Sequence, residues 1–137
     1  MDDIQEKILT FIVNENNQFL LLKGNKNDPQ FHQSFWYVVT GSCENKDINK
    51  FATITREVKE ETNLDVTETI YLDKVFQYNS LGKNCIEYVF LSKVNSSDVI
   101  LNEEHIDYKW CDFNEFIELI HWFENKTNLI NLLKKFI

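Results

Sequence analysis

Arg56-Glu57-Val58-Lys59-Glu60-Glu61 is the stretch that decides how this chain is read, because it places three carboxylates and one guanidinium within two turns of an expected helix. Glu57 and Glu61 are four residues apart and Glu60 follows Glu57 by three, so the carboxylates project from one side. Their repulsion weakens an isolated helix by roughly 0.2–0.5 kcal/mol per pair, and a bound cation would offset it. Oxygen ligands suit Mg²⁺ or Mn²⁺. The alternative is a solvated, glutamate-rich surface.

A longer pattern surrounds this run. Upstream the chain reads Thr40-Gly41-Ser42-Cys43-Glu44-Asn45-Lys46-Asp47, and a helix is expected from about Asn49 to Asn63. The whole resembles the Nudix box, G-x5-E-x7-R-E-U-x-E-E-x-G-U, in which U is an aliphatic residue. The matching positions are Gly41, Arg56, Glu57, Val58, Glu60, Glu61 and Leu64. A motif of this length is specific to its family.

The chain departs from this motif at two places. Asp47 stands where the motif has its first Glu, and eight residues rather than seven separate it from Arg56. We expect the loop to absorb the extra residue before the helix begins, and we assign Asp47 no catalytic role. Asn63 replaces the final Gly, a mild change because Asn also adopts left-handed geometry at helix ends.

Composition narrows the class of protein. The 137 residues predict one domain, 1–137, and a hydrophobic content of 43% supplies a core. Three Gly and one Pro argue against linkers. A net charge of -8 argues against binding a nucleic acid duplex, which requires clustered Lys and Arg. An acidic protein can still bind a small phosphorylated molecule if a metal bridges the two.

The cysteines and the termini give expectations about compartment. Cys43, Cys85 and Cys111 are widely spaced, so neither a zinc site nor a disulfide framework is expected. Met1-Asp2-Asp3 is acidic where a signal peptide would be basic, and no apolar run has membrane-spanning length. These features predict a cytoplasmic protein without a membrane partner.

Hydrophobic patterning predicts strands and helices in mixed order. The expected strands are 7–13, 18–23, 35–40, 67–78, 84–93 and 107–111. The first two form a hairpin, and a polar loop spans 24–34. Asn114 is expected to cap a helix through Ile120, and 127–137 to form a terminal helix. This order predicts an α/β (α+β) protein. Resemblance to Nudix proteins implies an α/β/α sandwich around a central mixed β-sheet.

Two helices carry apolar stripes. In the first, Phe51, Ile54 and Val58 follow helical spacing, and the glutamates centre about a quarter turn away. Such a helix packs on a sheet while one flank opens into a cleft. The terminal stripe consists of Leu129, Leu132, Leu133 and Phe136. It is expected to cover the protein's own core, with a homodimer as the alternative.

Segments outside the box resemble one group within the superfamily, the bacterial dihydroneopterin triphosphate pyrophosphatases, also called dATP pyrophosphohydrolases. The resemblance runs from about Leu20 to Asn125. Besides the box, it is carried by Phe35-Trp36, Val39 to Ser42, Glu104-His105, Tyr108-Lys109-Trp110 and Asn125.

The resemblance implies a Mg²⁺ site, with Mn²⁺ as an alternative ion. The implied metal-binding groups are Glu57, Glu61, Glu104 and the Gly41 carbonyl. Glu60 would be a further ligand or would orient water, and Arg56 would hold a helix carboxylate in place. Glu61 and Glu104 are the two candidates for the general base. The sequence does not choose between them, because neighbouring carboxylates on one metal titrate as a coupled set. Without this resemblance Glu104 would be an ordinary loop residue.

Four further residues are candidates for binding substrate. Trp36 would stack on a flat ring, with a place in the core as the alternative. Lys23 would contact phosphate unless it is simply solvated, and His105 would reach substrate unless it is structural. Thr40, beside Gly41, completes the set.

These expectations converge on hydrolysis of a phosphoric anhydride bond. A (deoxy)nucleoside triphosphate or dihydroneopterin triphosphate would be cleaved to the monophosphate and pyrophosphate. Alternatives within the class are an oxidised nucleotide, a dinucleoside polyphosphate or an RNA 5′ end. A non-hydrolysing nucleotide-sensing module is motivated by the spacing of Asp47, and an interaction protein by the terminal helix.

Overall fold

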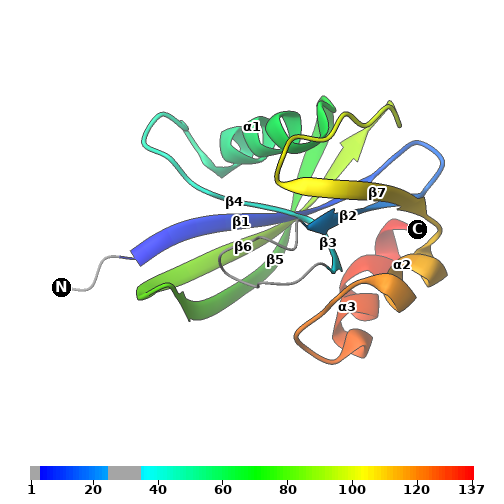
Figure 1. The fold of residues 1–137 in the computed structure, drawn as a ribbon. Helices are drawn as coiled ribbons and strands as arrows, with labels where there is room; N and C mark the ends of the chain where they lie inside the picture. The colour runs from blue at the N-terminus through cyan, green and yellow to red at the C-terminus, as the bar shows by residue number, and fades with distance from the viewer. Residues whose placement is uncertain (1–3, 25–34) are drawn as a thin grey trace.

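The computed structural model describes residues 4–24 and 35–137 (Figure 1). In these ranges seven strands and three α-helices follow one another, and a 3-10 turn (η1, Lys134–Phe136) ends the chain. The strands are β1 (Ile4–Val13), β2 (Phe19–Gly24), β3 (Trp36–Tyr37), β4 (Val39–Ser42), β5 (Val66–Ser80), β6 (Lys83–Val94) and β7 (His105–Cys111). The helices are α1 (Lys50–Thr62), α2 (Phe113–Leu119) and α3 (Lys126–Leu133).

The strands form one mixed sheet with β1 near its centre. β1 runs parallel to β6, and β6 pairs antiparallel with β5 at the edge. On its other side β1 pairs with β4 and, at the hairpin end, with β2. β2 in turn pairs with β3 and β7. Helix α1 covers one face, while α2 and α3 cover the other (Figure 1). The predicted sandwich around a mixed sheet is confirmed.

Helix α1 begins and ends where its caps are. The Asn49 side chain accepts a hydrogen bond from the backbone N–H of Ala52 at 2.9 Å, which satisfies one free donor of the first turn. Asn63 ends the helix in the left-handed conformation, with φ of 64°, so Asn takes the place of the motif's Gly. Both predicted ends are therefore confirmed.

Two apolar cores lie on the two faces of the sheet. Ile54 and Val58 of α1 pack with Ile8 and Ile12 of β1 on one face. On the other face, residues of α2 and α3 pack with the alternate residues of β1, and Phe116, Leu129 and Leu133 are buried there. The terminal apolar stripe thus covers the protein's own core, as expected.

Three sequence-based expectations about the elements are wrong. Phe51 does not belong to the buried stripe: it is 47% exposed, and its ring rests edge-on against Phe90 of β6. Asp112, not Asn114, caps α2, because its carboxylate accepts from the backbone N–H of Glu115 at 2.8 Å. The expected strand 35–40 is split, because β3 pairs with β2 whereas β4 pairs with β1. Most of the expected polar loop, 25–34, lies outside the described residues.

None of the helices in the described part of the chain has the length and apolar character needed to cross a bilayer.

Candidate active site

Arg56 links the loop before α1 to the carboxylates on the helix. Its guanidinium donates to both oxygens of Asp47, at 2.9 and 3.1 Å, and to the Ser42 carbonyl at 3.1 Å. It also donates to Glu57 Oε1 at 2.7 Å, whereas Glu60 lies farther away at 3.5 Å. The helix carboxylate that Arg56 holds is therefore chiefly Glu57.

Asp47 explains how the extra residue of the motif is accommodated. Its side chain is 6% exposed and accepts from the Glu44 backbone N–H at 3.0 Å and the Thr53 hydroxyl at 2.9 Å. These bonds fold the loop back before Asn49 begins the helix. The Arg56 hydrogen bonds, with that from Glu44, hold the pKa of Asp47 well below its usual range. Asp47 therefore positions Arg56 as a permanently charged partner.

Gly41 lies so close to Glu57 that a larger residue would displace the Glu57 carboxylate. Gly41 pairs with Ile8 of β1 and faces α1. A Cβ built on it would lie 2.3 Å from Glu57 Cδ, far inside ordinary contact. The Glu57 carboxylate is thus confined between the backbone of β4 and the Arg56 guanidinium.

Glu61 is a buried carboxylate in an acidic environment. The residue is 3% exposed, and its Oε2 has no hydrogen-bond partner among the residues that the structure describes. Burial, followed by the charges of Glu104 and Glu57, raises the pKa of Glu61 well above its ordinary value. Because an unpaired buried carboxylate is costly, this atom calls for a cation or a proton.

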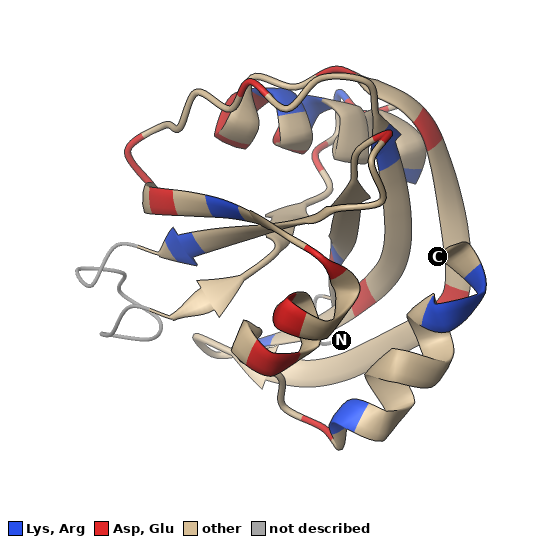
Figure 2. Cartoon of the chain, turned by 90° about the vertical axis from the view of Figure 1, so that its right-hand side faces the viewer, with Lys and Arg blue, Asp and Glu red and all other residues tan. Residues whose placement is uncertain are grey.

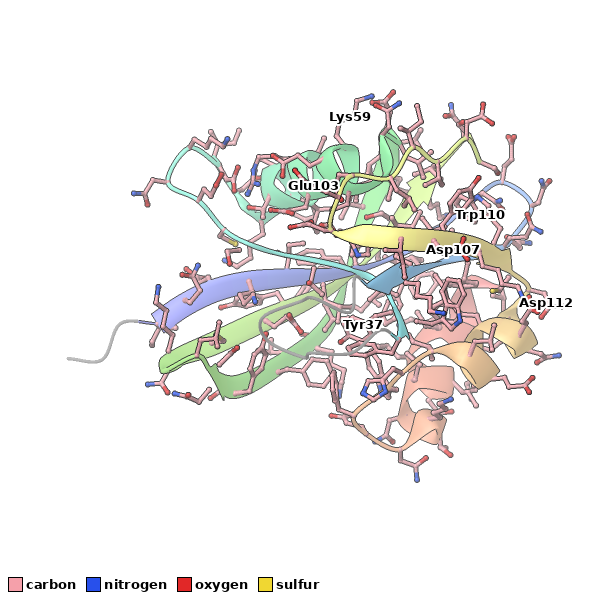
Figure 3. All side chains as sticks on the ribbon, viewed as in Figure 1. Tyr37, Lys59, Glu103, Asp107, Trp110 and Asp112 are labelled. Carbon is pink, nitrogen blue, oxygen red and sulfur yellow. The ribbon has the colours of Figure 1, made fainter. Side chains whose placement is uncertain are left out.

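The segment that leads into β7 brings two more ligand-type groups to Glu61. One ligand atom each from Glu61, Glu104 and His105 lie within 4.8 Å of one another. His105 Nε2 is 3.7 Å from Glu61 Oε1. Acidic positions occur on both α1 and this segment (Figure 2), and the neighbouring Glu103 marks the segment beside α1 (Figure 3). The two carboxylates of this set, with the buried Glu61 Oε2, fit a divalent cation.

The other predicted substrate contacts are distributed differently. Lys23 and Trp36 occupy paired positions of β2 and β3, and the Lys23 ammonium lies 5.8 Å from the centre of the Trp36 ring. The indole is half-buried against the core on the α2 side. Glu60 is half-exposed, at 52% of its side chain.

A cavity of about 360 Å³ lies on the face of the sheet opposite α1. Thr40, the one predicted contact that lines it, pairs with Leu9 of β1, whose side chain packs on this face. Sequence reasoning missed the other lining residues, which include Tyr37 (Figure 3), Tyr78, Glu87 and Trp122. One signal was available: Glu87 alternates with apolar residues at inward positions of its strand.

The chain is similar to known proteins both in sequence and in fold. The family model for the NUDIX domain matches residues 4–133. Dihydroneopterin triphosphate diphosphatase of Haemophilus influenzae is 24% identical over 146 residues, covering 96% of this chain and 87% of that protein. Bis(5'-nucleosyl)-tetraphosphatase (asymmetrical) of Caenorhabditis elegans is 30% identical over 123 residues, which cover 87% of this chain and 82% of that protein. The crystal structure of a MutT protein from Methanosarcina mazei has a TM-score of 0.74 at 23% identity, and the match covers 98% of this chain and 94% of that protein.

Proposed function

Because the chain belongs to the Nudix hydrolase family, we propose that it is a divalent-cation-dependent pyrophosphohydrolase of nucleoside or pterin triphosphates. The products would be the monophosphate and pyrophosphate. The observation that carries this proposal is the buried, unpartnered Glu61 Oε2 beside Glu104 and His105. The relatives named for dihydroneopterin triphosphate and for bis(5'-nucleosyl)-tetraphosphate supply the substrate classes to test.

The proposed metal ligands come from α1, β4 and the segment before β7. They are Glu57, Glu61, Glu104 and the Gly41 carbonyl. Mg²⁺ or Mn²⁺ bound there would offset the charge of the phosphate oxygens and lower the pKa of water. His105 was expected to contact substrate, and its Nε2 lies 3.7 Å from Glu61 Oε1. Because imidazole is a poor ligand for Mg²⁺ and Mn²⁺, we place His105 beside the oxygen ligands rather than among them.

The remaining residues position these groups and move the proton. Arg56 holds Glu57 in one orientation, and Asp47 fixes Arg56 in turn. Glu61 or Glu104 accepts the proton from the attacking water. Burial and the neighbouring charge of Glu104 raise the pKa of Glu61, so a proton is favoured on Glu61. Glu60, half-exposed at the edge of the site, orients water or substrate.

We place the ring of the substrate in the cavity opposite α1. Thr40 lines that cavity and Gly41, the next residue, contacts Glu57, so ring and phosphates would lie on the two faces of β4. β4 pairs with β1 along one edge, and no described strand pairs with its other edge. The phosphate chain would pass that edge. Tyr37, Phe76 and Trp122 give the cavity the flat apolar walls that suit a heterocycle.

The test is release of pyrophosphate from a substrate panel, with Mg²⁺ and with a chelator. The panel contains dihydroneopterin triphosphate, dATP, dGTP and diadenosine tetraphosphate. Turnover of a triphosphate that requires Mg²⁺ is expected, and Glu61→Gln should abolish it. Glu118→Gln, on the exposed surface of α2, is the matched control and should leave the rate unchanged. Binding without turnover of any member would instead identify a nucleotide sensor.

The displacement of Asp47, which motivated the nucleotide-sensing alternative, does not separate Asp47 from Arg56. Asp47 makes two hydrogen bonds to Arg56 from its new position. Cleavage of a dinucleoside polyphosphate remains the second candidate, because the 30%-identical relative is named for it.

A further inference from the structure

The cavity contains a buried carboxylate that the proposed hydrolysis does not use. Glu87 lies on β6, opposite Lys7 of β1, and is only 6% exposed although it lines the cavity. Its neighbours at alternate positions, Cys85 and Val89, are buried and apolar or nearly so. A carboxylate in such a position is costly unless it is paired or hydrogen-bonded.

The protein itself satisfies only part of this carboxylate. The Tyr78 hydroxyl donates to Glu87 Oε2 at 3.1 Å. Within 4–24 and 35–137 no other hydrogen bond to Glu87 occurs, although a carboxylate accepts several. Burial raises the pKa of Glu87, while the Tyr78 hydrogen bond and the Lys7 charge oppose the rise and favour the ionised form. The remaining oxygen is therefore an acceptor without a donor.

The walls beside Glu87 suit a flat ring. The rings of Tyr37 and Phe76 lie 6.3 and 5.7 Å from that of Trp122. The indole Nε1 of Trp122 is buried and lacks a hydrogen-bond partner among the described residues. Glu124 Oε2, from another lining residue, also lacks a hydrogen-bond partner among the described residues. A ligand with both donors and an acceptor on its rim would complement these groups.

We propose that Glu87 is a specificity-determining residue that accepts hydrogen bonds from a 2-amino-4-oxo heterocycle, the edge shared by guanine and pterins. This edge presents a ring N–H and an exocyclic NH₂ side by side, which matches a carboxylate held in one orientation. Adenine presents a donor beside an acceptor, and thymine one donor between two carbonyls, so neither offers the adjacent pair. The inference rests on the proposed function, because it assumes that the ring enters this cavity.

The experiment compares KM and kcat for dGTP, dihydroneopterin triphosphate, dITP and dATP. dITP keeps the ring N–H of dGTP but lacks the exocyclic amine. Losing one hydrogen bond to a charged group should raise KM by about 10- to 100-fold for dITP relative to dGTP. In Glu87→Gln, one donor of the edge loses its acceptor, so the dGTP and dITP values should converge. The lower KM of dGTP and dihydroneopterin triphosphate identifies whether guanine nucleotides or pterins are the substrate class that presents this edge.

Two features of the experiment distinguish a loss of ring recognition from misfolding of the Glu87→Gln variant. A variant that was merely misfolded would lose dGTP, dITP and dATP turnover in equal proportion, whereas the proposal predicts a change in their ratios. Glu68→Gln, on the exposed β5 edge and paired with Lys93, is the matched control and should leave the ratios unchanged. The wild-type comparison needs no variant, and equal KM values for dGTP, dITP and dATP, with no preference for the pterin, would overturn the proposal.

A binding measurement distinguishes failure of this proposal from failure of the proposed function. Calorimetry with GMP, neopterin and AMP, in the presence of a chelator, measures ring binding without hydrolysis. GMP or neopterin is expected to bind at least about tenfold more tightly than AMP. That result without turnover would reject only the hydrolase, whereas turnover with equal binding of all three would reject only the role of Glu87.

Discussion

Gly41→Ala tests whether the close approach of β4 to α1 is required for activity. The backbone at Gly41 is not left-handed, so the added methyl group acts only through its contacts. It would lie 2.3 Å from Glu57 Cδ, and ordinary contact begins near 3.4 Å. The Glu57 carboxylate must therefore move by about 1 Å, a displacement that can reduce a rate about 100-fold. We expect kcat/KM to fall by that factor, or about 2.7 kcal/mol in transition-state free energy.

The same geometry predicts that stability changes little. The clashing atoms belong to the end of a flexible side chain, so Glu57 can swing away while the core remains packed. Pyrophosphate release should be measured against Mg²⁺ concentration, together with thermal unfolding. Partial recovery at high Mg²⁺ is expected, because the displaced carboxylate weakens metal affinity. Gly24→Ala, whose Cβ would meet no described atom within 4 Å, is the control. Wild-type kcat/KM for Gly41→Ala at every Mg²⁺ concentration would refute the reasoning.

Two further predictions concern stability and its pH dependence. The pKa of Glu61 is higher in the folded state than in the unfolded state, where it is about 4.3. Above pH ~4.3 unfolding therefore releases a proton from Glu61. As pH rises from ~4.3 through the folded pKa, Glu61 increasingly lowers the free energy of unfolding. Glu61→Gln should therefore stabilise the metal-free protein at pH 7 while abolishing turnover; a lower melting temperature than wild type would contradict this. Asp47 has the opposite sign: its pKa is lowered by Arg56, so it stabilises the fold above pH ~3.9 and less as pH falls. Asp47→Asn should reduce the melting temperature at pH 7 and make the melting temperature depend less on pH in the acid range. If the variant and the wild type lose the same stability on acidification, Asp47 does not hold the loop.

The parts of the site that were predicted from the sequence are those encoded locally. The spacing of Glu57 and Glu61 places both on one flank of a helix, whatever the rest of the chain does. Asn49 and Asn63 act on backbone groups within four residues, so the helix ends were predictable too. Phe51 was misplaced because helical periodicity identifies an apolar face but does not tell how much of the first turn the sheet covers.

The parts that were missed depend on pairing between distant segments. The alternation in β6 places Glu87 at an inward position, but the cavity that it lines is formed by residues of other strands and of the segment after α2, which the pattern of β6 does not indicate. Asp47 looked like a defect in the motif because its partner, Arg56, reaches it only after the loop folds back. His105 joins Glu61 through the register of β7 against β2, which a linear pattern does not contain.

The arrangement around β4 explains why the chemistry of this chain is easier to predict than its substrate. Successive residues of a strand face opposite sides, so Gly41 contacts the metal-binding helix while Thr40 lines the cavity. The helix side is constrained, because Gly41, Arg56 and Glu57 fit one another too closely to vary singly. The cavity side is assembled from five strands and the segment between α2 and α3. Its lining can change without disturbing the carboxylates, so ring specificity must be sought in residues such as Glu87 rather than in the motif.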